Sequence, residues 1–586
     1  MINLDRHLLK VENPAQYLGN EMYSIHKKEY DVHMAIIYPD LYEVGMSSLA
    51  IRILYSVVNS VDGVYMERAF APKVDMEERM RSDKIPLFTI ESKTPLKELD
   101  AIGFSLSYEM TYTNLLNMLD LSGIPFERKE RGDEFPIVMA GGTGAYNPKI
   151  LEDFIDLFMV GEGEEVLREV AEILKENKNL SKNEKLKLLS KLEGVYVPAF
   201  YDGHRIKKRV IKDLNSLNYK EVNMVPYMEI VHDRLTVEIQ RGCTRGCRFC
   251  QAGIIYRPVR ERSVENARKL VCNGIAETGY NEVTLSSLST SDYSEIENLI
   301  DKIKEGHKDE NLSISLPSLR IEKHSVDTAL RVESGRKTGF TFAPEAGSQR
   351  MRDVINKGVT EEDIMETAEA AFKEGWKHVK FYFMIGLPFE KMEDVEEIYH
   401  LSKKVLAAAR KIDKGITITV SVSNFVPKSN TPFQWEKQMD FEEMVEKHRV
   451  LRELFKQERR LTLKIHEKEI SYLEGIISRG DEKTGKVIKR AWELGAKFDG
   501  WREHFNFNAW KKAMEECGID EKYYLGERDL EMELPWDMVD CGVTKEYFIS
   551  ERNRAIEEVL TRDCRNGCTN CGICSRFGLD MIVEKR

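Results

Sequence analysis

Three cysteines stand close together near the middle of the chain, at Cys243, Cys247 and Cys250. They follow the strand-like run 235–240 and have a C-x3-C-x2-C spacing within a glycine-containing loop. Three thiolates so arranged can each bind one iron of a cubic cluster and leave the fourth iron without a protein ligand. Because an iron of that kind can bind a substrate or cofactor, the loop predicts a catalytic [4Fe-4S] site.

A zinc site is the alternative for clustered cysteines. Structural zinc sites usually take four protein ligands from closely spaced Cys and His residues. The next cysteine here, Cys272, lies in a helix-like stretch and no histidine follows the loop closely. The ligand count therefore favours the iron–sulfur interpretation.

The triplet resembles the signature of the radical SAM superfamily, with Phe249 at the aromatic position before the last cysteine. This resemblance implies that the free iron binds the amino and carboxylate groups of S-adenosylmethionine (SAM). It also implies that one electron cleaves SAM to methionine and a 5′-deoxyadenosyl radical, which abstracts hydrogen from a substrate. A one-electron reductant such as flavodoxin or ferredoxin is then an expected partner.

Loops further along the chain carry other pieces of the superfamily pattern. Gly386 and Pro388 resemble the fifth-strand motif that meets the adenine, and Glu345 resembles the fourth-strand acid. Ser318 and Arg320 follow the third strand and are expected near the ribose or carboxylate of SAM.

One departure from the pattern follows the second strand. The superfamily often has Gly-Gly-Glu there, whereas this chain has Ser-Ser-Leu-Ser at 286–289. Ser287 and Ser289 are the candidates to replace those contacts.

A second group of cysteines lies near the end of the chain, at Cys564, Cys568, Cys571 and Cys574. Its first three members repeat the C-x3-C-x2-C spacing, but too little chain follows to build a barrel around a second SAM site. A fourth cysteine can complete the coordination shell, which favours an auxiliary [4Fe-4S] cluster over a four-cysteine zinc site. Its expected role is electron relay, substrate ligation or sulfur donation.

Composition limits the class of protein. A chain of 586 residues with 42% hydrophobic residues has room for three or four domains. A net charge of −12 gives no overall attraction to nucleic acid or an anionic membrane. No apolar run approaches a membrane span, no signal peptide opens the chain, and seven of ten cysteines fall in two clusters. We therefore expect a cytoplasmic protein without a membrane partner.

The first 200 residues alternate strand-like and helix-like runs, which predicts a doubly wound, Rossmann-like α/β domain with ligands at the carboxyl ends of its strands. The order resembles the cobalamin-binding domain that precedes many radical SAM domains. Ser105, Gly141 and Gly142 match the small residues that make room for the cobalamin nucleotide tail. The cobalt-ligating histidine is replaced by Tyr42, so the resemblance leaves open cobalamin bound without a protein ligand or a relic that docks substrate.

The remaining boundaries follow the same patterns. We predict an amino-terminal domain over 1–200, a connector over 201–231, a partial (β/α)6 TIM barrel over 232–435, a helical region over 436–560 and a Cys-rich tail over 561–586. Residues 443–468 have helical periodicity. Residues 423–435 resemble a segment of radical SAM methylthiotransferases, in which Phe433 and Trp435 would either stack on substrate or form core.

Taken together, the motifs resemble a little-characterised family of cobalamin-binding-like radical SAM proteins. The function we expect is modification of RNA or a ribosomal protein, of methylthiolation or methylation type. The alternatives are a cobalamin-dependent methylase of a small molecule and a non-catalytic iron–sulfur protein for electron transfer or RNA binding.

Overall fold

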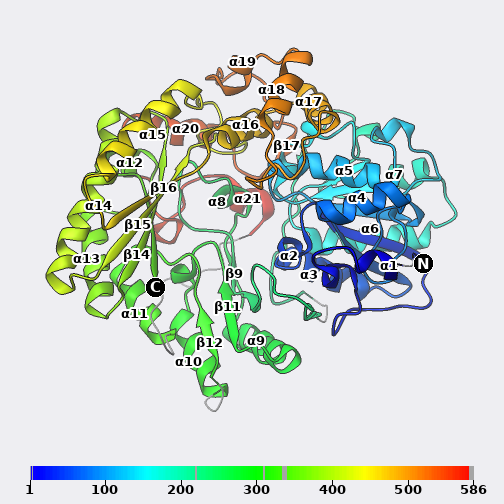
Figure 1. Cartoon of the computed structure of the whole chain (residues 1–586), viewed down its shortest axis with the longest axis horizontal. Coiled ribbons are helices and arrows are strands. Elements are labelled where there is room, and N and C mark those ends of the chain that lie inside the picture. The colour runs from blue at the N-terminus through cyan, green and yellow to red at the C-terminus, as the bar shows by residue number, and fades with distance from the viewer. Residues whose placement is uncertain (1, 3, 218–220, 308–310, 333–338, 580–586) are drawn as a thin grey trace.

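Two lobes make up the molecule (Figure 1): an amino-terminal α/β domain on the right and a barrel-like lobe on the left, with the carboxyl-terminal helices along the top. This computed structural model describes residues 2, 4–217, 221–307, 311–332 and 339–579. Within these residues, no helix combines the length and apolar character needed to cross a membrane.

The amino-terminal sheet has the predicted doubly wound order. Five parallel strands lie in the order β2-β1-β3-β4-β5, and a short antiparallel strand, β6, pairs at the edge. Nearly every strand residue is buried because helices cover both faces. The strands are β1 Val32–Tyr38, β2 Val64–Phe70, β3 Ala101–Ser105, β4 Ile137–Gly141, β5 Leu157–Met159 and β6 Val195–Tyr196.

Two pairs of helices complete this domain. Helices α3 (Leu49–Asn59) and α6 (Gly163–Glu176) share an apolar core with one sheet face. Helices α4 (Val74–Asp83) and α5 (Tyr112–Ser122) share the core of the opposite face. The two faces therefore have separate cores, and the carboxyl ends of the strands stay available for a ligand.

Parallel strands also build the second lobe, as predicted for an incomplete barrel. A three-stranded sheet β8-β11-β12 and a four-stranded sheet β13-β14-β15-β16 carry helices on their outer side (Figure 1). The strands are β8 Leu235–Glu238, β11 Glu282–Ser286, β12 Ser313–Ser315, β13 Phe340–Glu345, β14 His378–Ile385, β15 Thr417–Asn424 and β16 Leu461–Ile465. The principal helices are α9 Val264–Thr278, α10 Ile296–Gly306, α11 Lys323–Val332, α13 Glu361–Lys373, α14 Met392–Ile412 and α15 Phe441–Phe455.

The prediction of helix throughout 443–468 is wrong for its second half. Helix α15 ends at Phe455, and β16 then pairs in parallel with β15. The reason is the alternation in Leu-Thr-Leu-Lys-Ile, whose period of two suits a strand better than a helix. The barrel sheet thus continues beyond residue 435.

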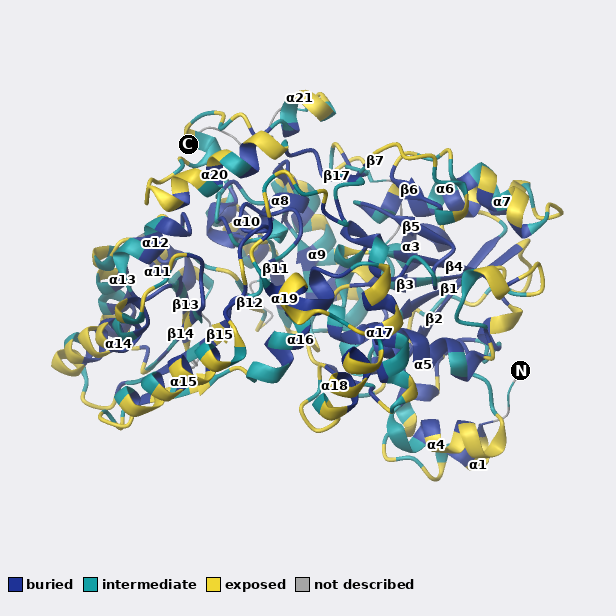
Figure 2. Ribbon diagram, turned by 90° about the horizontal axis from the view of Figure 1, so that it is seen from above, coloured by how far each residue is buried: buried dark blue, intermediate teal, exposed yellow. Residues whose placement is uncertain are grey.

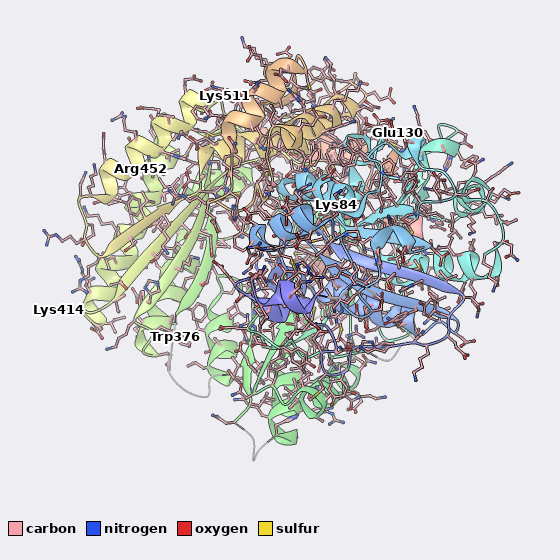
Figure 3. The ribbon with its side chains drawn as sticks, turned by 45° about the vertical axis from the view of Figure 1, so that its right-hand side comes forward. Lys84, Glu130, Trp376, Lys414, Arg452 and Lys511 are labelled. Atoms are coloured by element: carbon pink, nitrogen blue, oxygen red, sulfur yellow. The ribbon has the colours of Figure 1, made fainter. Side chains whose placement is uncertain are left out.

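The carboxyl-terminal helices pack against the amino-terminal domain. Helices α16 (Lys468–Ser478), α17 (Glu482–Glu493) and α18 (Phe507–Glu516) share one apolar core with α5. The connector is tied to the same region, because β7 (Ile206–Lys207) pairs with β17 (Val539–Asp540). Figure 2 shows the buried strands of the amino-terminal sheet inside exposed helices such as α7 (Lys182–Leu189). Charged side chains such as Lys84, Glu130 and Lys511 lie on the outer surface (Figure 3).

A buried carboxyl group joins these two parts of the chain. Asp499 is fully buried and accepts hydrogen bonds from Thr113 Oγ1 at 2.6 Å and Trp510 Nε1 at 2.9 Å. Burial raises the pKa of Asp499 to about 6, although both hydrogen bonds favour its ionised form. The folded state therefore binds this proton more tightly than the unfolded state does.

This raised pKa predicts a pH-dependent stability. The contribution of Asp499 is most favourable below about pH 4 and is lost as the pH rises to about 6, where the folded carboxyl ionises. Asp499→Asn should be more stable than the unmodified chain by up to about 3 kcal/mol above pH 6 and no more stable near pH 4. Urea unfolding from pH 4 to pH 8 measures this difference, and a difference independent of pH would contradict it.

Candidate active site

The cysteine triplet lies at the carboxyl end of the first barrel strand. After β8, the pair β9 (Gln240–Arg241) and β10 (Arg260–Glu261) forms the base of the loop, and α8 (Ala252–Ile255) follows it. All three thiols are free and partly buried, and the Gly253 amide donates to Cys250 Sγ at 3.3 Å. Carboxyl-end loops are where barrel enzymes place their reacting groups.

Burial controls the ionisation of the triplet. It raises the pKa of the Cys243 thiol to about 12 and that of Cys250 to about 11, and the neighbouring cysteines add to both shifts. Iron binds thiolates, so loading a cluster must release these protons. No three Cys, His, Asp or Glu side chains in the described ranges converge as ligands of one metal ion. A cubic cluster takes one thiolate per iron, so its ligands are spread more widely than those of a single ion.

The Phe249 side chain contacts loops that follow other strands of the barrel. Its ring packs against an apolar cluster that includes Ala346 after β13, Leu387 after β14 and Phe433. The aromatic position of the motif therefore connects the cysteine loop to the loops that follow the fourth and fifth strands.

An ion pair beside the triplet was missed by the sequence analysis. Lys357 Nζ lies 3.1 Å from Glu345 Oε1, the predicted fourth-strand acid. Burial alone would lower the pKa of Lys357, but Glu345 and Cys247 nearby raise it. Both Lys357 and Glu345 also influence the pKa of Cys250. The ion pair of Lys357 and Glu345 therefore lies beside the cysteine loop.

The other predicted SAM contacts surround the same end of the barrel. Ser289 donates to Asp292 Oδ2 at 2.6 Å, and Arg320 donates to Glu322 Oε1 at 3.1 Å and to the Lys357 carbonyl at 3.2 Å. The backbone is left-handed at Ser318 and Glu345. Gly386 also has a positive φ, and a Cβ there would lie 2.5 Å from Met439 Sδ. Pro388 is buried two residues later.

A buried arginine clamps the cysteine loop. Arg248 is fully buried, and its Nε donates to Glu551 Oε2 at 3.1 Å. Its other nitrogens donate to the carbonyls of Val354 at 2.8 Å and Val559 at 2.6 Å. Glu551 belongs to α20 (Lys545–Ile556), so the end of the chain helps to hold the loop.

The carboxyl-terminal cysteines begin directly beside the first loop. The Cys564 amide donates to the Thr244 carbonyl at 3.3 Å, and Thr244 Oγ1 donates to Asp563 Oδ2 at 2.9 Å. Arg245 Nε lies 2.9 Å from Asp563 Oδ2 and also pairs with Asp292. The two cysteine groups thus share one set of backbone and ionic contacts.

The tail cysteines differ in exposure. Cys571 is buried, Cys568 is exposed, and Cys564 and Cys574 are intermediate. Burial raises the pKa of Cys564, and the guanidinium of Arg257 acts in the opposite direction. Arg257 Nη2 also donates to the Arg245 carbonyl at 3.2 Å, so this buried cation lies between the two groups.

A cavity of about 370 Å³ lies between the amino-terminal sheet and the cysteine loop. One wall is the sheet face near its carboxyl edge, where Gly103, Ser105 and Gly141 have small side chains or none. Helices α3 and α6 cover this wall, and Gly142 closes it with a φ of +97°. The barrel side is lined by Glu238, Gln240, Arg241, Gly242, Tyr256, Ser286, Ser287 and Leu288.

The ionic groups at this cavity are paired with one another. Arg241 Nη2 lies 2.7 Å from Glu164 Oε1 and 2.8 Å from Glu238 Oε2, and Arg241 Nη1 lies 3.4 Å from Glu162. Glu162 also pairs with Arg260. Two guanidinium groups face three carboxylates, so every charge has an opposite partner and one negative charge is left in excess. The cavity therefore favours an uncharged group over a strongly anionic one.

Tyr42 does not line the cavity. Its ring is buried in a cluster with Phe70, Ile90 and Ile230, and its hydroxyl donates to Glu21 Oε1 at 2.9 Å. Glu21 in turn pairs with the fully buried Arg68. Tyr42 therefore has a structural role in this chain.

Phe433 and Trp435 are completely buried. Phe433 packs with Phe425 and Leu387, and Trp435 belongs to the core shared with the amino-terminal domain. Of the two alternatives from the sequence, core packing is confirmed and stacking on substrate is wrong.

Comparison with known proteins agrees with this arrangement. Residues 50–198 match the family model for the amino-terminal part of radical SAM proteins, and residues 237–402 match that of the radical SAM superfamily. The chain belongs to the radical SAM superfamily. It is 30% identical over 414 residues to an uncharacterized protein of Methanocaldococcus jannaschii, covering 69% of this chain and 80% of that one.

Two further relatives are more distant. An uncharacterized methyltransferase of Pyrococcus horikoshii is 23% identical over 282 residues, which covers 46% of this chain and 58% of that protein. Among solved structures, the radical SAM methyltransferase TsrM from Kitasatospora setae, with cobalamin and a [4Fe-4S] cluster bound, superposes with a TM-score of 0.48 at 12% identity. That alignment covers 67% of this chain and 74% of TsrM.

Proposed function

We propose that this radical SAM enzyme is a methyltransferase that uses cobalamin, held between the amino-terminal domain and the barrel. The observation that carries the proposal is the cavity beside the cysteine loop, because it coincides with the small residues Ser105, Gly141 and Gly142. The name of the P. horikoshii relative gives further support. The identity of the substrate stays a prediction, with RNA, a ribosomal protein and a small molecule as the candidates.

The residues that line the cavity fit one part of cobalamin, its nucleotide tail. A cavity of about 370 Å³ is near the lower end of the range for ligand sites, so it suits a group of nucleotide size more than a whole corrinoid. Gly103, Ser105 and Gly141 would accept that nucleotide tail, and Tyr42 would leave the cobalt without a protein ligand. Bound cobalamin would supply the carrier for a methyl group, and the cysteine loop with SAM would supply the radical.

We also propose that Cys564, Cys568, Cys571 and Cys574 hold a second [4Fe-4S] cluster. Its support is the contact between the tail and the first loop through Thr244 and Asp563. Such a position suits electron relay to the first site. A sulfur-donor role, which would belong to methylthiolation, is the alternative for the same cysteines.

Filling the cavity tests the proposed function. A Cβ at Gly103 would meet only the Met139 methyl at 3.6 Å and the Ala35 carbonyl at 3.9 Å, so leucine fits the backbone and its side chain enters the cavity. After anaerobic loading with hydroxocobalamin and gel filtration, absorbance should show about one corrinoid per unmodified chain. Gly103→Leu should weaken retention at least tenfold, about 1.4 kcal/mol.

The matched control is Gly306→Leu, since Gly306 is exposed and has open space around its Cβ position. It should retain cobalamin normally. If the unmodified chain retains none, or if Gly103→Leu retains as much as the control, the proposed cofactor site is wrong.

A further inference from the structure

The four-stranded barrel sheet has one apolar face and one polar face. The apolar side chains of β13–β16 pack against α13, α14 and α15. The opposite face is turned toward β11 and β12 (Figures 1 and 2) and includes Thr341, Lys380, Tyr382, Ser421, Thr462 and Lys464. Branched apolar side chains fill the interior of a closed barrel. This face carries none of them and leaves Tyr382 40% exposed, so it is a surface and not a core.

Two lysines on the polar face have no counter-ion. The Lys380 ammonium contacts the hydroxyl and the ring of Tyr382 on the same strand. Neither Lys380 nor Lys464 forms an ion pair within the part of the chain that the structure describes. The one acid on this face of the described strands, Glu345, is already paired, with its Oε1 3.1 Å from Lys357 Nζ. The polar face therefore keeps positive charge in a protein whose net charge is −12.

The polar face continues to the cysteine loop. Lys380, Tyr382 and Met384 follow one another along β14 toward its carboxyl end. Met384 packs in the apolar cluster that contains Phe249 of the cysteine triplet. A strand rises about 3.3 Å per residue, so Lys380 lies about 13 Å along the strand from Met384. A ligand held by the lysines can thus extend to the cysteine loop.

The positive charge also runs along the edge strand of this sheet. Lys464 on β16 lies beside Ser421, which lies beside Tyr382. Arg460 and His466 flank β16 and continue the alternation that places Lys464 on the polar face. From Arg460 to His466 the chain spans about 20 Å, whereas a nucleic-acid strand carries one phosphate per about 3.4 Å of helix axis. The line of charge therefore matches several successive phosphates better than a single one.

We propose that the polar face binds single-stranded RNA, one of the three candidate substrates. Lysine ammonium groups neutralise phosphates, and hydroxyl side chains donate hydrogen bonds to phosphate oxygens. An exposed aromatic ring such as that of Tyr382 can stack on an unpaired base. A basic protein substrate would be repelled by the same unpaired lysines. The inference rests on the proposed function, because it names the substrate of that methyltransferase.

The test is fluorescence anisotropy of the full chain with a fluorescein-labelled RNA of about 15 nucleotides, a length that covers a typical single-strand site. The double variant Lys380→Met, Lys464→Met should bind this RNA about tenfold more weakly, because two phosphate contacts are lost. The slope of log Kd against log salt concentration should fall by about 1.4, since each phosphate contact to a single strand contributes about 0.7.

The matched control is the double variant Lys84→Met, Lys511→Met, which makes the same change in charge on the outer surface (Figure 3). It should keep the affinity and the salt slope of the unmodified chain. All substituted lysines lie at or near the surface, so thermal midpoints should change little.

Three results would overturn the inference. They are no RNA binding by the unmodified chain, equal affinity of the two double variants, and displacement of the probe by adenosine monophosphate as readily as by unlabelled RNA. The last result would assign the face to a small phosphorylated molecule. The RNA measurement needs no corrinoid, so failure to retain hydroxocobalamin would count against the proposed function without deciding whether RNA binds this face.

Discussion

Replacing Cys243 with alanine is expected to abolish reductive cleavage of SAM. The triplet supplies only three ligands, so loss of one leaves a cubic cluster without enough thiolates to hold it. Reconstituted protein should lose about four iron atoms per chain, and 5′-deoxyadenosine should fall to the level of a protein-free control. Iron and sulfide assays with chromatography of SAM products measure both effects.

Cys571→Ala is the matched variant for this experiment, because it removes a buried cysteine of the tail and leaves the triplet intact. If the tail holds a cluster, Cys571→Ala should lose the roughly four iron atoms of that tail cluster. Cys243→Ala should keep those atoms and lose the ones bound at the triplet. Unchanged iron together with lost zinc would make the tail a zinc site. Normal 5′-deoxyadenosine production by Cys243→Ala would contradict the assignment of the triplet.

Arg248→Met should have the largest effect outside the cysteines. The guanidinium is fully buried, and its removal leaves the Glu551 carboxylate with only the Thr561 hydroxyl and the more distant Arg554 as partners. Breaking a buried pair from one side costs about 3–5 kcal/mol. Because Arg248 lies between Cys247 and Cys250, the variant should also lose iron from the first site.

Arg554→Met is the control for that substitution. Arg554 also approaches Glu551, at 4.0 Å, but its side chain is 45% exposed. An exposed pair contributes about 0–1 kcal/mol, so this variant should keep its stability and its iron. Urea unfolding and iron content decide the question, and equal results for the two variants would show that Arg248 does not clamp the loop.

The sequence predicted the parts of this protein that depend on local patterns. The triplet, the strand before it and the alternating α/β order are all visible within short windows, and the strand expected over 235–240 is present as β8 and β9. Ser105 and Gly141 were named through the resemblance to cobalamin-binding domains, and both line the cavity. Each of these features is encoded by neighbours in the chain.

Contacts between distant segments were beyond that reasoning. Thr244 and Asp563 are separated by 319 residues, and no local pattern indicates that the tail meets the first loop. Lys357 was missed because a lysine in a loop is usually solvated. The direction of the Tyr42 side chain depends on the buried pair of Glu21 and Arg68, which no local pattern indicates.

The most direct test of the central claim is product analysis with the cofactors in place. Protein loaded with iron, sulfide and hydroxocobalamin is incubated anaerobically with SAM and a one-electron reductant. We expect S-adenosylhomocysteine, the product left when SAM gives up its methyl group, together with 5′-deoxyadenosine, and we expect the former to depend on the corrinoid. Production of 5′-deoxyadenosine alone, with no S-adenosylhomocysteine from corrinoid-loaded protein, would contradict the assignment as a cobalamin-dependent methyltransferase.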